Sequence, residues 1–225
     1  IRCTVAYDGN HFLGFQSQTQ GETVQDVIEQ ALQKLFGFRV VVHPAGRTDA
    51  GVCARAQVFH IDVPPKTRRM PVTARLLLST FRTRLPPTVV VYEARHVSRN
   101  FHARRCCVKK KYVYSVFRGF ADPFQKPFVW ELGTKRKLNV EVMRRAAQSL
   151  LGKHDYSALS IINDGDERSP IKTMERVDIE EVDGPSGLLT ITTVCDRYMC
   201  VGSCLSCHPQ SACSVLTSEF VSGTK

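Results

Sequence analysis

The chain has 225 residues, of which 43% are hydrophobic and 23% are charged, with 31 Lys and Arg against 21 Asp and Glu. This composition is typical of a globular protein of one or two domains and excludes disordered, collagen-like and coiled-coil chains. No apolar run reaches the roughly 20 residues that span a bilayer. The sequence contains no apolar leader for secretion, and because it begins at Ile1 inside a strand-like run, any targeting segment would lie outside it. The nine cysteines, an odd number without a secretory leader, indicate reduced thiols, so we expect an intracellular protein, in the cytoplasm, an organelle or the nucleus.

The excess positive charge lies in the middle of the chain. Residues 61–120 carry fourteen Lys and Arg and two acidic residues, whereas the segments before and after contribute zero and −2 to the net charge of +10. A localised basic block predicts a polyanionic partner such as a nucleic acid. The alternative is solvated charge that serves only solubility.

In the first half of the chain, hydrophobic periodicity predicts an alternation of strands and helices. Thr23 and Asp26 form a capping box in front of an apolar stripe with helical spacing, and Gly37 ends that stripe. In chain order we expect a strand at residues 1–7, a helix at 23–37, strands at 38–43 and 56–63, a helix at 71–85 and a strand at 88–97. The order β-α-β-β-α-β is that of a ferredoxin-like half, with an antiparallel sheet and helices on one face.

The second half begins in the same way but stops early. We expect a strand at residues 108–117, a helix capped by Asn139 and ended by Gly152, and a hairpin formed by 171–182 and 187–194. The final helix and strand of a second half have no counterpart in the Ser- and Cys-rich residues after 199. The expected fold class is α+β, with two ferredoxin-like halves around an antiparallel central sheet and the second half incomplete. The expected parts are 1–100, 101–199 and a disordered tail at 200–225.

One loop between two expected strands combines a carboxylate, a cation and two glycines. This loop, Gly46–Gly51, reads Gly-Arg-Thr-Asp-Ala-Gly. Its glycines allow unusual backbone angles and close approach of a ligand, and Arg47 could hold Asp49 ionised or contact a phosphate. Asp49 could act as nucleophile or base toward a sugar or heterocycle. The alternative is a charged turn with a local ion pair.

Basic and aromatic residues alternate in the basic block. The basic side chains expected to neutralise phosphates are Arg104, Arg105, Lys109, Lys110 and Lys111. Tyr112 and Tyr114 follow at strand spacing and could stack on an unpaired base. The alternative is a half-buried strand in which both tyrosines pack inward.

Several motifs in series resemble the tRNA pseudouridine synthases of the TruA type, over roughly residues 1–199. The first five motifs are Tyr7-Asp8-Gly9, Phe12-x-Gly14-Phe15-Gln16-x-Gln18, Thr23-Val24-Gln25, Gly46-Arg47-Thr48-Asp49-Ala50-Gly51-Val52 and Phe101-His102-Ala103-Arg104. The remaining motifs are Lys111-Tyr112-x-Tyr114, Leu151-Gly152-x-His154-Asp155-Tyr156-Ser157 and Arg168-Ser169-Pro170-x-Lys172-Thr173.

The resemblance implies an isomerase that converts uridine to pseudouridine at positions 38–40 in the anticodon arm of tRNA. It assigns catalysis to Asp49, as nucleophile on the ribose or as base at C2′, support of the flipped base to Arg47 and stacking on the uracil to Tyr112. It implies no cofactor and no metal, because nothing is oxidised. It also implies a homodimer, whereas the altered C-terminus argues against one.

The chain departs from the family pattern at three places. Cys53 stands where the family usually has His, and Lys172 stands where Arg is usual, which keeps the charge but loses the bidentate geometry. The segment after Met199 lacks the family Arg that pairs with the catalytic Asp. We expect this tail to come from a shifted reading frame, a retained intron or alternative splicing. An inactive RNA-binding paralogue or truncated isoform is therefore the alternative function.

The tail also contains Cys204-Leu205-Ser206-Cys207-His208, a C-x-x-C-H pattern that attaches haem or, with further Cys residues, could bind zinc. An ordinary α+β metal-binding protein is a third interpretation. The alternative for the motif is a disordered tail with free thiols.

Overall fold

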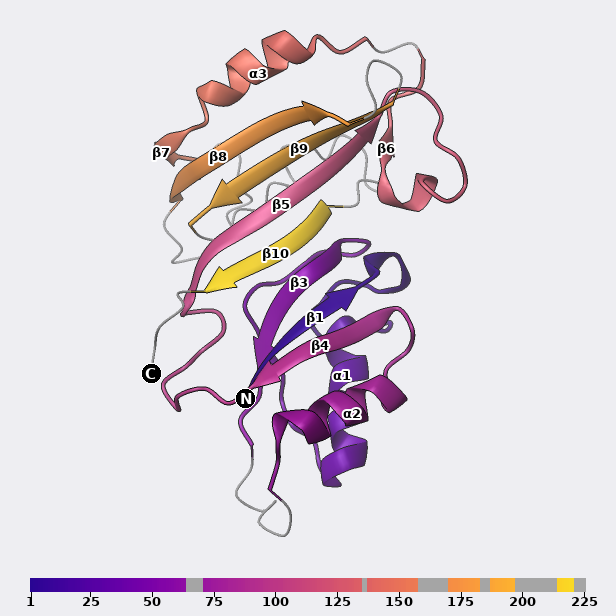
Figure 1. Ribbon diagram of the computed structural model, residues 1–225, viewed down its shortest axis with the longest axis vertical. Coiled ribbons are helices and arrows are strands. Elements are labelled where there is room, and N and C mark those ends of the chain that lie inside the picture. The colour runs from indigo at the N-terminus through magenta and orange to yellow at the C-terminus, as the bar shows by residue number, and fades with distance from the viewer. Residues whose placement is uncertain (64–70, 135–136, 158–169, 183–186, 197–213, 221–225) are drawn as a thin grey trace. The chain divides into compact units, whose positions relative to one another are not determined.

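The computed structural model describes the chain except for residues 64–70, 135–136, 158–169, 183–186, 197–213 and 221–225 (Figure 1). The chain forms two compact units, one of Ile1–Cys107 with Leu216–Lys225 and the other of Val108–Val215. The expected boundary after residue 100 falls seven residues before the observed one. No helix among the described residues is both long and apolar enough to cross a membrane.

The first unit has the expected order β-α-β-β-α-β. Its elements are β1 (Arg2–Tyr7), α1 (Val24–Phe36), β2 (His43–Pro44), β3 (Cys53–His60), α2 (Ala74–Arg84) and β4 (Val89–Arg95), with a short 3-10 helix at Gly9–His11. The strand order is β4-β1-β3, with β2 paired to β3, and all of these pairs are antiparallel. Helices α1 and α2 lie together beside these strands (Figure 1).

The ends of the helices follow local capping chemistry. The Thr23 side chain accepts a hydrogen bond from the Asp26 amide in the predicted capping box, and Gly37 ends α1 with a φ of 78°. Helix α2 begins three residues later than predicted because the Thr73 side chain caps it by accepting from the Leu76 amide. The apolar faces of both helices bury Ile28, Leu32, Leu77 and Phe81, and the Phe81 ring contacts that of Phe59 on β3.

The predicted strand at residues 38–43 is wrong for most of its length. Val40 and Val42 are buried as a strand pattern requires, but only His43–Pro44 pair with β3. The Val42 amide donates to the Glu29 carboxylate of α1 at 3.1 Å, and Arg39 binds the same carboxylate at 2.8 Å. A side chain therefore replaces the strand partner that the sequence pattern suggested.

Among its described residues, the second unit contains one α-helix and the expected long strands. Its elements are β5 (Cys107–Phe117), a 3-10 turn at Lys126–Phe128, β6 (Trp130–Glu131), α3 (Val140–Gln148), β7 (Gly152–Asp155), β8 (Ile171–Glu181) and β9 (Leu188–Cys195). The strand order is β5-β9-β8-β7, and each of these pairs is antiparallel. Asn139 caps α3 as predicted, but Gly152 starts β7 instead of ending the helix.

Part of the C-terminal tail differs from the expectation of disorder. Residues Ser214–Phe220 form β10, which follows β3 in the strand order. Val215 and Phe220 are residue types that favour strands, and the frequent serines around them conceal this signal in the sequence. The C-x-x-C-H motif and the position of the missing family Arg lie outside the described residues.

Candidate active site

The Gly46–Gly51 loop, hereafter the Asp49 loop, connects β2 to β3 and presents its two charged residues to solvent. Arg47 and Asp49 are exposed, whereas Thr48 between them is 8% exposed. The loop borders a hollow of about 390 Å³ whose lining residues are Leu13, Gln16, Ser17, Gln18, Arg47, Thr48, Asp49 and Ala50. The structure thus brings together the predicted catalytic carboxylate and the predicted Arg at one hollow.

Buried polar side chains hold the inner side of the Asp49 loop. The Tyr7 hydroxyl of β1 lies 2.8 Å from the Thr48 hydroxyl, and the Gln57 amide of β3 donates to the Gly46 carbonyl at 2.8 Å. Tyr7 also hydrogen-bonds to the side chain of Gln57. Burial raises the pKa of Tyr7 above its usual range, so this hydroxyl stays protonated at neutral pH.

Backbone contacts hold the outer side of the same loop. The Phe15 amide donates to the Thr48 carbonyl at 3.1 Å, and the Gly51 amide donates to the Phe12 carbonyl at 3.4 Å. Gly14, with a φ of +96°, packs so close that a Cβ atom there would lie 2.5 Å from the Thr48 carbonyl oxygen. The motif that contains Phe12, Gly14 and Phe15 therefore supports the loop directly.

The opposite wall of the hollow is tied to helix α1. The Ser17 amide donates to the Gln25 side chain at 3.1 Å, and Gln25 in turn donates to Glu29 at 2.7 Å. Both Gln25 and Glu29 are buried, at 8% and 5% exposure. These bonds fix the Gln16–Gln18 segment against the first two turns of α1.

The departure at Cys53 is accommodated at the end of the loop. Cys53 is 6% exposed, and its Sγ accepts a hydrogen bond from the Gly9 amide at 3.3 Å. A Cβ atom on Gly9 would lie 2.1 Å from the Val52 carbonyl oxygen, so the backbones of the two segments are in direct contact. Cys53 thus has a packing and hydrogen-bonding role here.

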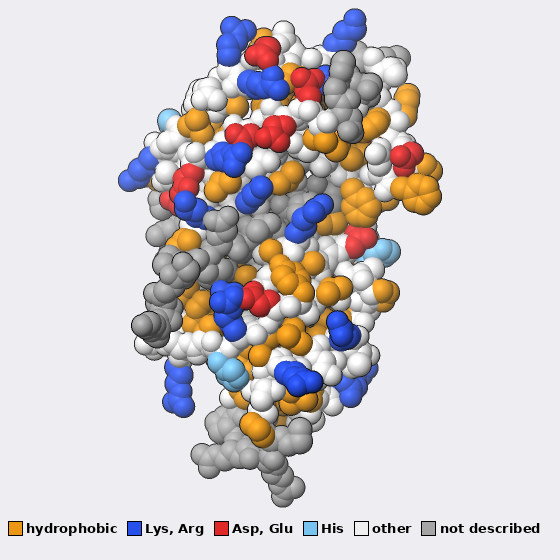
Figure 2. All heavy atoms as spheres, viewed as in Figure 1, with side chains coloured by type: hydrophobic (Ala, Val, Ile, Leu, Met, Phe, Trp, Pro, Cys, Tyr) orange, Lys and Arg blue, Asp and Glu red, His pale blue; other side chains and the backbone are white. Residues whose placement is uncertain are grey.

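The predicted RNA-binding residues fall into three environments. Arg104 and Arg105 are exposed on a turn of the first unit, and Lys111 is half-buried on β5. Lys109 forms an ion pair with Glu175 at 2.6 Å, and Lys110 is only 3% exposed. On the face shown in Figure 2, Lys and Arg side chains are dispersed among acidic and hydrophobic ones and do not form one continuous patch.

Tyr112 shares a buried face of β5 with Lys110 and Tyr114. Its ring is 7% exposed and that of Tyr114 is 5% exposed. The inward packing that the sequence left open as an alternative therefore describes both tyrosines. Tyr112 belongs to the second unit, whereas the Asp49 loop belongs to the first.

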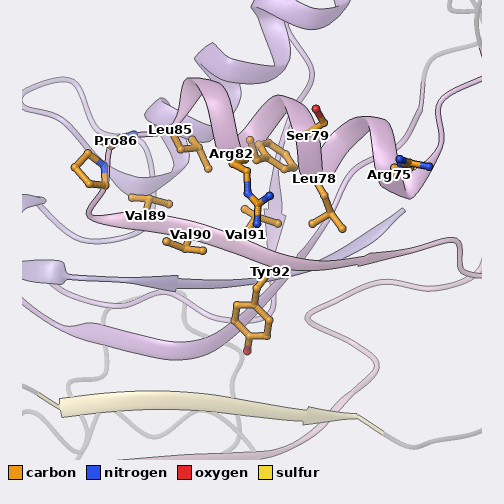
Figure 3. A pocket seen from close by; sticks show the side chains of 12 residues that line it. Arg75, Leu78, Ser79, Arg82, Leu85, Pro86, Val89, Val90, Val91 and Tyr92 are labelled. Atoms are coloured by element: carbon orange, nitrogen blue, oxygen red, sulfur yellow. The ribbon is translucent and has the colours of Figure 1, made fainter.

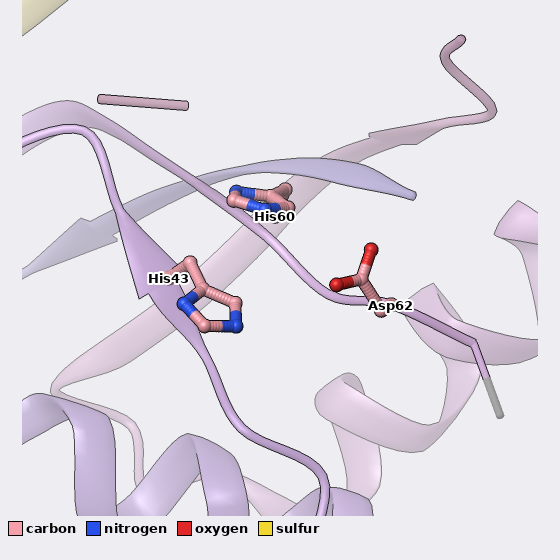
Figure 4. Close-up of side chains that lie close together, drawn as sticks. All are labelled: His43, His60 and Asp62. Atoms are coloured by element: carbon pink, nitrogen blue, oxygen red, sulfur yellow. The ribbon is translucent and has the colours of Figure 1, made fainter. Parts of the chain in front are cut away.

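Among the described residues, one cluster has side chains of the metal-ligating type. His43, His60 and Asp62 place potential ligand atoms within 4.8 Å of one another (Figure 4). However, the Nδ1 atom of His60 accepts a hydrogen bond from the Ala103 amide at 3.2 Å. The neutral ring then carries its proton on Nε2 and has no second lone pair for a metal. The cluster is better suited to anchor the segment around Ala103.

Burial and the neighbouring rings also keep His60 neutral. It stacks on His43 with ring centroids 4.8 Å apart, and His102 lies at the same centroid distance. Desolvation and these two histidines lower the pKa of His60 from 6.5 to about 4.

A larger hollow of about 660 Å³ lies between α2 and β4 (Figure 3). Its lining is mostly apolar, with Arg75 and Arg82 from the helix and Tyr92 from the strand. None of its lining residues is an Asp, Glu, His or Cys. It therefore lacks a general base, and the hollow beside Asp49 is the better candidate for chemistry.

Comparisons with known proteins show which family the chain belongs to. Residues 4–104 match a family model described as tRNA pseudouridine synthase. The tRNA pseudouridine synthase A of Akkermansia muciniphila is 42% identical over 173 residues, covering 76% of this chain and 63% of that protein. The protein of the same name from Chromobacterium violaceum is 39% identical over 187 residues, covering 82% of this chain and 68% of that protein. The chain belongs to the tRNA pseudouridine synthase A family.

The match to family members does not extend over their whole length. The chain spans 63% of the Akkermansia protein and 57% of the Solidesulfovibrio magneticus protein, to which it is 41% identical over 162 residues. A solved Cbf5-Nop10-Gar1 complex matches 96% of this chain and 47% of its own chain with a TM-score of 0.39 at 10% identity. That likeness is too weak to support any conclusion.

The sequence motifs indicate the charged residues of the candidate site. They assign no role to the residues whose hydrogen bonds hold the Asp49 loop in place. Thr48 and Tyr7 appear only as letters of motifs, and Gln57 belongs to none of the family motifs. The available signal is a lone Gln on a strand face that is otherwise apolar, with Phe59, Ile61 and Val63 at the alternate positions, because a fully buried amide requires hydrogen-bond partners.

Proposed function

We propose that this chain isomerises uridine to pseudouridine in tRNA. The observation that carries the proposal is the exposed Asp49 side chain, presented beside a hollow by a loop that is hydrogen-bonded from both sides. The hollow lies within the size range of ligand pockets, roughly 300–1,000 Å³. Membership of the family supports the assignment of catalysis to this carboxylate.

The reaction moves one bond and leaves the atom count unchanged. The Asp49 carboxylate attacks C1′ of the ribose or removes a proton from C2′, and in either case the bond from C1′ to N1 of uracil breaks. The uracil rotates and C5 bonds to C1′, while the bond between Asp49 and C1′ breaks in the first route or a proton returns to C2′ in the second. The proton on C5 then leaves to solvent, and N1 gains one. No electrons are exchanged with an external donor or acceptor, so the proposal invokes no cofactor.

The target base has to leave the helical stack before Asp49 can reach the ribose, at a cost of a few kcal/mol. Arg47 lines the same hollow as Asp49 and is proposed to support the flipped nucleotide. Tyr112 is proposed to stack on the uracil. Because its ring is 7% exposed, this role requires that the ring become accessible when RNA binds.

Exposed cations are proposed to bind the phosphates of the anticodon arm. Arg104 and Arg105 fit this role because both are exposed. Lys111 is half-buried, so it is only partly accessible to a phosphate. Lys109 and Lys110 would first have to leave an ion pair and a buried site, respectively. Positions 38–40 as the target and a homodimer remain predictions from the resemblance. A second ferredoxin-like half without its final helix and strand remains a prediction from the hydrophobic pattern.

The test is release of tritium from tRNA that carries tritium at C5 of its uridines, measured together with tRNA binding. An active synthase releases tritium because C5 exchanges its hydrogen for the bond to C1′. Binding without release would contradict the proposal and favour an inactive RNA-binding relative. The departure from the family pattern after Met199, which leaves out the Arg that pairs with the catalytic Asp in the family, is the sequence feature behind this second function.

A further inference from the structure

A buried polar network lies beneath the Asp49 loop and contains no group that the proposed reaction uses. Its members are Tyr7, Thr48 and Gln57, with exposures of 4%, 8% and 0%. We infer that Tyr7 and Gln57 are positioning residues for Asp49, acting through Thr48 and Gly46. This inference rests on the proposed function and extends it to the residues that set the geometry of the carboxylate.

Thr48 is the residue of the loop that is hydrogen-bonded at both its side chain and its carbonyl. Its hydroxyl faces inward to the Tyr7 hydroxyl at 2.8 Å, while the side chains on either side of it, Arg47 and Asp49, are exposed. The Phe15 amide binds the Thr48 carbonyl from the other side at 3.1 Å. With one residue held at both its side chain and its carbonyl, the adjacent residue Asp49 has little freedom to turn.

Gln57 joins the start of the loop to the same network. Its amide nitrogen donates to the Gly46 carbonyl at 2.8 Å, and its side chain also hydrogen-bonds to Tyr7. A fully buried amide is costly unless its hydrogen bonds are satisfied, and a chain of such bonds fixes one arrangement. The network therefore favours a single loop conformation.

Accurate placement matters because a displacement of about 1 Å at a reacting group can cost roughly 100-fold in rate. The hydroxyl–hydroxyl bond can be removed from either end with little change in shape. Thr48→Val replaces a hydroxyl with a methyl group, and Tyr7→Phe deletes only the hydroxyl. Thr48→Ser keeps the hydroxyl and serves as the conservative variant.

Thr4→Val is a matched control for a purely structural effect. Thr4 lies on the same strand as Tyr7, is 5% exposed, and donates to the Glu93 carboxylate at 2.7 Å. This variant loses a buried hydroxyl and a hydrogen bond as Thr48→Val does, but at a site that does not contact the Asp49 loop.

The experiment measures hydrogen–deuterium exchange of residues 46–52 and tritium release from C5-labelled tRNA for the full chain and these variants. Thr48→Val and Tyr7→Phe should each speed loop exchange and lower kcat about 10- to 100-fold, with tRNA affinity within about two-fold. The double variant should be no worse than Tyr7→Phe alone, because Tyr7→Phe already removes the bond that Thr48→Val breaks. Thr48→Ser should retain activity, and Thr4→Val should leave both readouts unchanged.

Loop exchange at the wild-type rate in Thr48→Val, or a kcat equal to that of Thr4→Val, would overturn the inference. If the unmodified chain releases no tritium, the proposed function fails, and the exchange measurement still decides whether the network holds the loop.

Discussion

The two groups of residues that the proposed function uses, one on the Asp49 loop and one on β5, are held in different ways. On the Asp49 loop, the charged side chains are exposed and an uncharged neighbour, Thr48, is buried as the anchor. On β5, the strand alternation places Lys110 and Tyr112 on the buried face, and Lys109 is paired with Glu175. A loop can thus expose functional groups without regard to strand alternation, whereas a strand exposes only the side chains on its free face.

This difference separates two requirements of the proposed reaction. The carboxylate is already accessible and held, so its chemistry depends on the stability of a small network. The strand residues require a change in accessibility before they can meet RNA. Mutations in the loop should therefore change the rate of reaction, and mutations among the exposed cations should change binding.

The largest effect on stability is expected for Gly14→Ala, which tests how closely the loop is packed. A Cβ atom there would lie 2.5 Å from the Thr48 carbonyl oxygen at a φ of +96°. We expect the free energy of unfolding, measured by urea denaturation, to fall by about 2–4 kcal/mol.

Gly37→Ala is the control for Gly14→Ala. Gly37 also has a positive φ, but a Cβ atom on this residue would have no neighbour within 4 Å. The free energy of unfolding of Gly37→Ala should fall by only about 1 kcal/mol, which is the cost of a left-handed backbone conformation for a residue with a Cβ atom. Equal losses at the two positions would show that the contact with Thr48 is unimportant.

A smaller effect is expected from the titration of His60, which anchors the segment carrying Arg104. The pKa of His60 is lowered in the folded protein to about 4, so between about pH 6.5 and pH 4 the unfolded chain binds more protons than the folded one. The free energy of unfolding is therefore at its full value above about pH 6.5, and it decreases by about 2 kcal/mol as the pH falls through this range.

The measurement is urea unfolding between about pH 7 and pH 4.5, compared with His60→Asn. Removing the imidazole should reduce the change in the free energy of unfolding with pH in this range. An unchanged slope in His60→Asn would assign the acid sensitivity to other groups.

The smallest effect is expected for single cations. Arg104→Ala and Arg105→Ala should each weaken tRNA binding by about 1 kcal/mol and reduce the dependence of affinity on salt by about one counterion. Lys109→Ala should change the salt dependence less, because Glu175 already neutralises this ammonium group. A larger effect at Lys109 than at Arg104 would mean that the ion pair opens on RNA binding.

Local signals in the sequence were sufficient for much of the fold. The Thr23–Asp26 capping box and Gly37 bound α1 where the structure places it, and the alternation in β5 matches its observed burial. The Asp49 loop was also recognisable, because its two glycines and charged residues lie between two expected strands.

Features that depend on tertiary contacts could not be predicted in this way. Residues 38–42 have the pattern of a strand, but the Glu29 side chain takes the hydrogen bond of the Val42 amide. Likewise, nothing local indicates that Gln57 reaches the Gly46 carbonyl across the loop. The network beneath Asp49 is visible only in three dimensions.

The most direct test of the central claim is tritium release by Asp49→Asn, which keeps the shape of the side chain and removes its charge. Asp62→Asn is the control, because Asp62 is an exposed carboxylate beyond the opposite end of β3. We predict a loss of about 10³-fold or more in rate for Asp49→Asn with tRNA binding intact, and little change for Asp62→Asn. A rate for Asp49→Asn within about ten-fold of the unmodified chain would contradict the assignment of the chemistry to this carboxylate.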